Sequence, residues 1–147
     1  MGTQPNIVGV HLVFEQAGQV LLQRRSPDAR FAPGTWHVPA GHLERESAAE
    51  CAVRECDEEL GVTIEPQDLR LVHVLHYRTT IGSTPRMQLF FRVLRYRGTP
   101  KICEPDRCTA LGWHPYSALP SPLVDYTAVA LTAIAVGRSY TAMGWGA

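Results

Sequence analysis

The chain has 147 residues, and its 14 basic and 14 acidic side chains give a formal net charge of zero. This length predicts one domain over residues 1–147 with a sizeable core, and the balanced charge argues against a nucleic acid partner. No membrane partner is expected either, because the longest apolar run, residues 128–136, is too short to span a bilayer.

The four cysteines and the N-terminal residues favour a cytoplasmic protein. Neither Cys51 with Cys56 nor Cys103 with Cys108 has the spacing of a zinc site. Free thiols are the default in a cytoplasmic protein, and residues 1–5 show no secretory signal.

The first part of the chain predicts a β-hairpin and a loop. Residues 6–14 are rich in Val, Ile and Leu, and residues 19–24 are expected to be their hairpin partner across a turn at 16–18. Arg25 ends the second strand, where its guanidinium would be either solvated or in contact with a ligand. Residues 26–35 contain two prolines and a glycine and predict a loop.

An acidic helix is predicted over residues 48–60. Ser47 and Glu50 have the spacing of a capping box, and Gly61 provides the left-handed residue that often ends a helix. The expected apolar side of this helix consists of Ala49, Ala52, Val53, Cys56 and Leu60.

Three glutamates of this helix, Glu55, Glu58 and Glu59, stand at i, i+3 and i+4 and are expected on one face. Like charges this close destabilise a helix. Either the face is simply solvated, or its oxygen atoms bind a hard cation.

The remainder of the chain predicts a mixed sheet covered by helices on both faces. The expected elements are strands at residues 69–78 and 86–96 with a loop containing Gly82, an irregular segment at 102–109 with Glu104, a short strand at 110–114, and an apolar helix at 126–136 capped by Asp125. Residues 140–147 give no clear prediction. The rings of Trp36, Trp113 and Phe90 are expected in the core, and the imidazoles of His42, His73 and His76 are expected to be structural or incidental.

Residues 54–62 read Arg-Glu-Cys-Asp-Glu-Glu-Leu-Gly-Val, and seven residues separate Glu46 from Arg54. This pattern resembles the Nudix box, G-x5-E-x7-R-E-U-x-E-E-x-G-U with U apolar. Further similarity lies at residues 21–25, 34–36, 41–44, 104–106, 113 and 119–120, so the resemblance covers about residues 6–140. One departure is that four residues, not five, lie between Gly41 and Glu46, which we interpret as a one-residue deletion.

The resemblance implies an α+β fold, an α/β/α sandwich, and a site for Mg²⁺, with Mn²⁺ as a substitute. The implied metal ligands are Glu55, Glu58, Glu59, Glu104 and the carbonyl group of Ala40. The implied catalytic residues are Glu55, Glu58, Arg54 and Glu46, of which Arg54 and Glu46 pair to orient the loop. One of the helix glutamates or Glu104 removes the proton from the attacking water.

The implied reaction is hydrolysis of a nucleoside triphosphate or another nucleoside diphosphate derivative. Arg25, Gly41 and Tyr77 are the expected substrate-binding residues; Arg25 matches a position that touches the nucleotide in 8-oxo-guanine nucleotide hydrolases, and Tyr77 lies near a tyrosine of dinucleoside polyphosphate hydrolases. One alternative is a module that binds nucleotides without turnover, which the short loop between Gly41 and Glu46 suggests. The other is an acidic structural helix without metal. Both a monomer and a homodimer are compatible with the sequence.

Overall fold

The structure is a computed structural model that describes residues 2–80 and 82–146. Its larger sheet is mixed and has the strand order β5-β1-β7-β6-β9. The strands are β1 (Ile7–Val13), β5 (Ala40–His42), β6 (Leu69–Tyr77), β7 (Arg86–Val93) and β9 (Tyr140–Met143). β1 is parallel to β7 and antiparallel to β5, while β6 is antiparallel to β7 and parallel to β9.

A second, antiparallel sheet is formed by β2 (Glu15–Gln16), β3 (Gln19–Arg25), β4 (Trp36–His37) and β8 (Cys108–Pro115). The predicted hairpin is therefore wrong in part, because β3 pairs with β2 and β8 and not with β1. Both hydrogen-bonding edges of β1 are occupied by β5 and β7. The turn itself is confirmed: Ala17 and Gly18 have φ values of 48° and 75°, as in the two-residue turns that suit hairpins.

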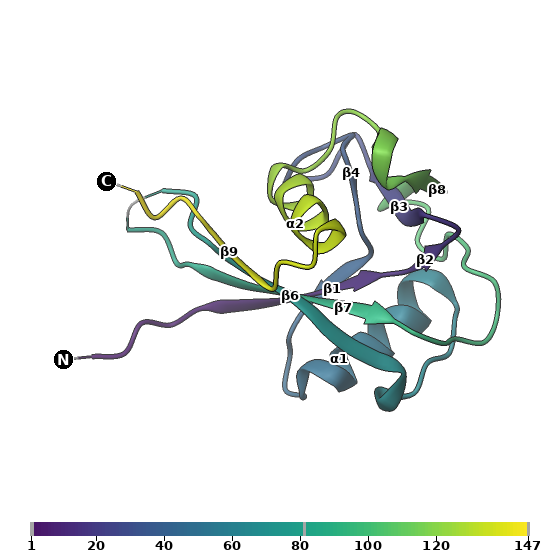
Figure 1. Cartoon of the computed structure of the whole chain (residues 1–147), viewed down its shortest axis with the longest axis horizontal. Helices are drawn as coiled ribbons and strands as arrows, with labels where there is room; N and C mark the ends of the chain where they lie inside the picture. Colours follow the sequence, from purple (N-terminus) through teal and green to yellow (C-terminus); the bar gives the residue numbers. More distant parts are fainter. Residues whose placement is uncertain (1, 81, 147) are drawn as a thin grey trace.

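Two helices cover opposite faces of the larger sheet, as Figure 1 shows. One is α1 (Ala48–Glu55), which continues as the π-helical turn η1 (Cys56–Leu60), and the other is α2 (Asp125–Ala135). Short 3₁₀ turns form at η2 (Pro66–Asp68) and η3 (Tyr116–Ala118). The predicted α/β/α arrangement of the α+β chain is confirmed.

The boundaries predicted for the acidic helix are confirmed. The backbone N–H of Glu50 donates to Ser47 Oγ at 3.2 Å, and the Glu50 carboxylate accepts from the Ser47 N–H at 3.3 Å. Gly61 ends η1 in the left-handed conformation, with φ 66° and ψ 25°. The local sequence alone is sufficient for these two ends because each depends on residues within one turn.

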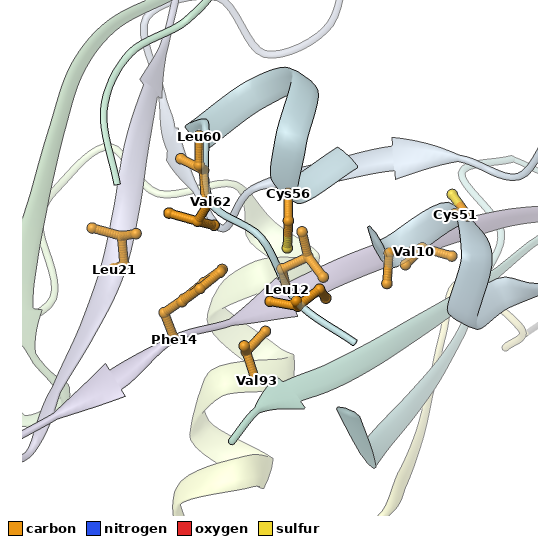
Figure 2. Packing of buried hydrophobic residues seen from close by; sticks show 11 residues of the cluster. Val10, Leu12, Phe14, Leu21, Cys51, Cys56, Leu60, Val62 and Val93 are labelled. Carbon is orange, nitrogen blue, oxygen red and sulfur yellow. The ribbon is translucent and has the colours of Figure 1, made fainter. Parts of the chain in front are cut away.

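Two apolar clusters hold the helices on the sheet. Between η1 and the sheet, Cys56 points towards Leu12, and Leu60 lies beside Val62 in the same cluster, as Figure 2 shows. Ala49 is not part of this cluster, although it was predicted on the apolar side. The second cluster lies under α2 and is built around Phe90 and Leu131. Trp36 and Trp113 pack against the second and first cluster, respectively, so the expected core role of the three rings is confirmed.

Several expectations for the C-terminal half change. Asp125 is the first helical residue and Val124 precedes it as the cap; the Asp125 carboxylate accepts from the next N–H, at 2.7 Å, and from the Tyr77 hydroxyl, at 3.5 Å. The segment 140–147, left without a prediction, contributes β9. The buried His73 joins it to the sheet, with Nδ1 donating to the Arg138 carbonyl group and Nε2 bonded to Thr141, both at 2.8 Å.

All four cysteines are free thiols, as predicted. Within residues 2–80 and 82–146, none of the helices combines the length and apolar character needed to cross a bilayer.

Candidate active site

A cavity of about 950 Å³ lies where the two sheets, the α1–η1 segment and α2 meet. Many of the predicted site residues line it: Arg25, Ala40, Gly41, Glu55, Glu59, Tyr77 and Glu104. Three others, Glu46, Arg54 and Glu58, are not among its lining residues. The predicted residues therefore divide into a set inside the cavity and a set beside it.

The π-helical turn causes part of this division. A hydrogen bond that spans five residues gives a smaller angular step per residue than an α-helix has, which rotates Glu58 and Glu59 relative to their positions in a regular α-helix. Glu55 and Glu59 line the cavity and Glu58 does not, although Glu55 and Glu58 both contact Arg54 Nη1. Glu55 is buried with 10% of its side chain exposed, whereas 54% of the Glu58 side chain is exposed. Glu59 is turned inwards and lines the cavity.

Glu59 is anchored on β5. Its Oε2 accepts a hydrogen bond from the Ala40 N–H at 3.1 Å. Burial raises the pKa of Glu59 to about 8, and the negative charge of Glu55 acts in the same direction. An uncompensated carboxylate in such a place is costly unless a proton or a cation neutralises it.

Glu55 lies against Gly41. A side chain at position 41 would overlap the Glu55 carboxylate, so the absence of a Cβ there lets the carboxylate approach the β5 backbone. Burial raises the pKa of Glu55, with Glu58 and Glu104 acting in the same direction and Arg54 opposing. Glu55 Oε1 accepts from Arg54 Nη1 at 2.8 Å.

Glu104 reaches the cavity from the loop before β8. Its carbonyl group accepts from the N–H groups of Arg107 and Cys108 at 2.9 and 3.0 Å, which closes a tight turn. The charge of Glu104 raises the pKa of both Glu55 and Glu59. Three carboxylates thus face a common space although they come from distant parts of the chain.

Arg54 is the centre of an ion-pair network beside the cavity. It contacts Glu46 at 2.8 Å, Glu44 at 3.0 Å and Glu58 at 3.3 Å, in addition to Glu55. The bond to Glu46 is bidentate, with Nε and Nη2 as donors, and it lowers the pKa of Glu46. The predicted pairing is therefore present, and the shortened loop still brings Glu46 onto the helix.

The carboxylates fit a divalent cation in chemistry and in charge, because hard oxygen ligands with raised pKa values are what such an ion stabilises. The carboxylates are not close enough together to coordinate one ion in this structure. Among residues 2–80 and 82–146, no three His, Cys, Asp or Glu side chains form a group that could hold a metal ion. Arg54 occupies one oxygen atom of Glu55, and Glu58 does not line the cavity.

All three predicted substrate-binding residues line the cavity: Gly41 lies against Glu55, and Arg25 and Tyr77 come from β3 and β6. Arg25 Nε donates to the Phe31 carbonyl group at 2.7 Å, and its guanidinium lies 5.5 Å from the centre of the Phe31 ring. The Tyr77 hydroxyl is 3.5 Å from the carboxylate of Asp125, and its ring lies against Tyr126. Both side chains face the space in which a ligand would lie.

Sequence reasoning missed five buried polar residues that line the same cavity: His11, Gln23, Ser26, His37 and Gln88. A usable signal exists for His11, because it is the single polar residue in the otherwise apolar strand β1. His42, which was expected to be incidental, also lines the cavity, whereas His73 and His76 do not.

The buried histidines predict that acid destabilises the fold. Burial lowers the pKa of His11 to about 4 and that of His37 to about 3, from an ordinary value of 6.5. The unfolded chain therefore binds more protons below pH 6.5, so the stability that these neutral histidines contribute is complete above pH 6.5 and is lost as the pH falls towards 4. We expect His11→Gln to reduce the slope of unfolding free energy against pH by about 1 kcal/mol per unit in this range.

Urea unfolding between pH 4.5 and 7.5 measures this slope. His114→Gln is the control, since His114 is only partly buried on β8. A slope that stays the same in His11→Gln and in the parent protein would show that His11 is not the group responsible.

Comparison with known proteins identifies the family. The family model described as NUDIX domain matches residues 3–132. The chain is 40% identical over 108 residues to the isopentenyl-diphosphate Delta-isomerase of Jannaschia sp. (strain CCS1), covering 69% of this chain and 60% of that protein. It is 31% identical over 114 residues to the human 8-oxo-dGDP phosphatase NUDT18, covering 74% and 32%. The chain thus spans less than two thirds of the length of either relative.

The fold has a close counterpart among solved structures. The MutT NUDIX hydrolase from Burkholderia pseudomallei superposes with a TM-score of 0.78 at 28% identity, over 88% of this chain and 98% of that one. Most of the chain is matched by the family model, and the glutamates of the motif lie in or beside the cavity. The chain therefore belongs to the Nudix hydrolase family.

Proposed function

We propose that this chain is a Mg²⁺-dependent pyrophosphohydrolase that acts on a nucleoside triphosphate or another nucleoside diphosphate derivative. The observation that carries the proposal is the convergence of Glu55, Glu59 and Glu104 on one cavity that is also lined by arginines. Carboxylates alone would repel a diphosphate, so the two groups can share the cavity only with a cation between them.

The roles follow from position. Glu55, Glu59 and Glu104 would hold the cation, with the Ala40 carbonyl group and Glu58 as further ligands. Bound Mg²⁺ supplies positive charge to the diphosphate and lowers the pKa of water. One of the cavity glutamates takes the proton of the attacking water.

The neighbouring residues position these groups. Arg54 and Glu46 hold the loop before α1 against the helix, which keeps Glu55 beside Gly41. Arg25, Arg86 and Arg107 line the cavity and would neutralise phosphate oxygens that the cation does not reach.

The names of the two curated relatives support a diphosphate ligand. One is a phosphatase of 8-oxo-dGDP and the other an isomerase of isopentenyl diphosphate, so a diphosphate is the group that both names share. We also propose a cytoplasmic location on the basis of the four free thiols.

A nucleotide panel with product identification tests this function. With Mg²⁺ or Mn²⁺ present, we expect a nucleoside triphosphate to yield a monophosphate and pyrophosphate, and we expect EDTA to abolish turnover. A ligand at 100 times its dissociation constant should also stabilise the fold by about 2.7 kcal/mol, which a thermal shift with each metal detects.

The alternatives give different results. Nucleotide binding without turnover of any substrate would show a non-catalytic module. If turnover, nucleotide binding and metal-dependent stabilisation were all absent, the acidic helix would be a structural element that binds no metal.

A further inference from the structure

The last strand of the larger sheet has one unpaired edge. β9 follows β6 at the end of the strand order (Figure 1), and within residues 2–80 and 82–146 no further strand pairs with it. The carbonyl groups of Ser139 and Met143 accept from N–H groups of β6 at 2.9 and 3.0 Å. Because backbone groups alternate in direction along a strand, the N–H and carbonyl groups of Tyr140 and Ala142 point away from β6. Both residues are exposed, so these backbone groups are available to another strand.

This edge lacks the features that prevent strands from pairing. β9 contains neither a charged residue nor a proline, and these residues are the usual protection of an edge strand. The edge is also held in place by side chains. His73 bonds to the Thr141 hydroxyl at 2.8 Å, and Trp145 Nε1 donates to the His76 carbonyl group at 3.0 Å. A strand that is already ordered loses little conformational freedom when it binds another strand.

A groove lies between this edge and α2. It has a volume of about 480 Å³, and Arg138 and Thr141 line it on the side of β9. On the side of α2 it is lined by small or apolar residues: Ala128, Val129, Thr132, Ala133 and Val136. The groove shares no lining residue with the cavity of the candidate active site, so it is a separate feature of the surface.

α2 has no charged face. Residues 126–136 contain no Asp, Glu, Lys or Arg, whereas a helix on a protein surface usually exposes charged residues on one side. Val136 is 76% exposed, and Thr132 and Ala135 are exposed as well. A helix that is apolar on all sides is normally buried on all sides, and contiguous apolar surface of this kind marks an interface.

The edge is complementary to a second copy of itself. In an antiparallel pair with a two-fold axis at Thr141, Tyr140 of one copy lies opposite Ala142 of the other. The outward backbone groups of these residues then exchange hydrogen bonds, and the large ring of Tyr140 covers the small side chain of Ala142. The same axis places both α2 helices on one face of the joined sheet, where the two grooves face each other.

Electrostatic repulsion does not oppose this pairing. The formal net charge of the chain is zero, so two copies carry no net charge that would keep them apart. Arg138 is exposed just before β9, but it lies three residues from the axis, which separates its two copies by about 20 Å. Charges at that distance are screened at physiological salt, where the Debye length is about 8 Å.

We propose that two copies of this chain form a homodimer through β9 and the groove beside α2, with one sheet continuous across the two-fold axis. A different protein would have to supply both an unpaired strand and an apolar helix at the same spacing, and the second copy supplies both by symmetry. The dimer is independent of the proposed hydrolysis, because the groove and the cavity are lined by different residues.

Sedimentation equilibrium of the full chain between about 2 and 200 μM measures the association. We expect the mean mass to rise from 16.3 kDa towards twice that value. Amide hydrogen exchange followed by NMR locates the interface. The outward N–H groups of Tyr140 and Ala142 exchange fast in the monomer, and we expect their exchange to slow by about 10-fold or more as the dimer forms.

Two variants test the two parts of the interface. Thr132→Arg places a charge in the groove at an exposed helical position, where arginine favours the helix more than threonine does. Ala142→Pro removes an outward N–H group and leaves the bonds to β6 in place, as a proline at a sheet edge does. Each is expected to raise the dissociation constant of the dimer by roughly 10-fold or more. Thr99→Arg, at an exposed position in the loop after β7, is the matched control and should retain the dimer. Thermal melting verifies that the variants are folded.

Each outcome decides the proposal. A dimer that both variants weaken and Thr99→Arg does not would support it, whether or not the protein hydrolyses a nucleotide. A dimer that either variant leaves intact, or one in which the N–H groups of Tyr140 and Ala142 still exchange fast, would place the interface elsewhere and overturn it. A parent protein that stays monomeric at the highest concentration would also overturn it, and would leave the edge of β9 to a strand of a different protein.

Discussion

Glu59→Gln is expected to lower kcat/KM by about 10²- to 10⁴-fold, the range typical of a lost acid–base or cation-binding carboxylate. The substitution is nearly isosteric, and the new amide oxygen can still accept the hydrogen bond from the Ala40 N–H. What disappears is the negative charge, which the cation and the reaction require. Steady-state assays with saturating Mg²⁺ measure the loss.

The same variant should be at least as stable as the parent protein. Because burial raises the pKa of Glu59 to about 8, the folded state holds a proton that the unfolded state releases above its ordinary pKa. Without metal, the carboxylate therefore makes the parent protein lose stability as the pH rises towards 8, and Glu59→Gln removes that loss. Urea unfolding at pH 6 and pH 9 in EDTA would show this difference.

Asp57→Asn is the matched control, because it removes one negative charge from an exposed position of the same turn. It should keep nearly full activity. Glu58→Gln tests the half-exposed glutamate beside the cavity, which contacts Arg54. Full activity in both Glu58→Gln and Glu59→Gln would refute the assignment of this helix to metal-dependent hydrolysis.

Arg54→Ala is expected to reduce activity by about 10- to 100-fold, as is typical when a group that orients metal ligands is lost. Arg54 separates four carboxylates, those of Glu44, Glu46, Glu55 and Glu58. Without it, their repulsion would displace Glu55 and detach the loop before α1. We expect the free energy of unfolding to fall by about 1–3 kcal/mol, because buried Glu55 loses its charged partner.

Arg54→Lys should recover little of the activity and stability that Arg54→Ala loses, because a lysine cannot make the bidentate bond to Glu46 while it also contacts Glu55. Arg97→Ala is the control: Arg97 pairs with Glu65 at 3.6 Å in an exposed position, where an ion pair contributes little. Denaturant unfolding and kinetics on the same preparations separate the two effects. Normal kinetics in Arg54→Ala would show that the ion-pair network does not position the site.

Local sequence was sufficient for the features that depend on neighbours within one turn. The capping box at Ser47 and the left-handed Gly61 determine where the acidic helix begins and ends. The pattern of residues 46–62 was also sufficient for the family, since its spacing is specific. By contrast, the length of β8 and the pairing of β9 depend on partner strands that the local sequence does not identify.

Only the tertiary structure decided which predicted residues meet. Helical spacing placed Glu55, Glu58 and Glu59 on one face, but Glu58, in the π-helical turn, does not line the cavity, and Glu104 comes from a loop far along the chain. His11 and Gln88 both line the cavity although they are 77 residues apart, and they meet because β1 runs parallel to β7. The sequence by itself determined the helix, the motif and the family, because these depend on short-range spacing. The cavity and its chemistry required the tertiary structure, because they depend on contacts between distant segments that only the packed sheet brings together.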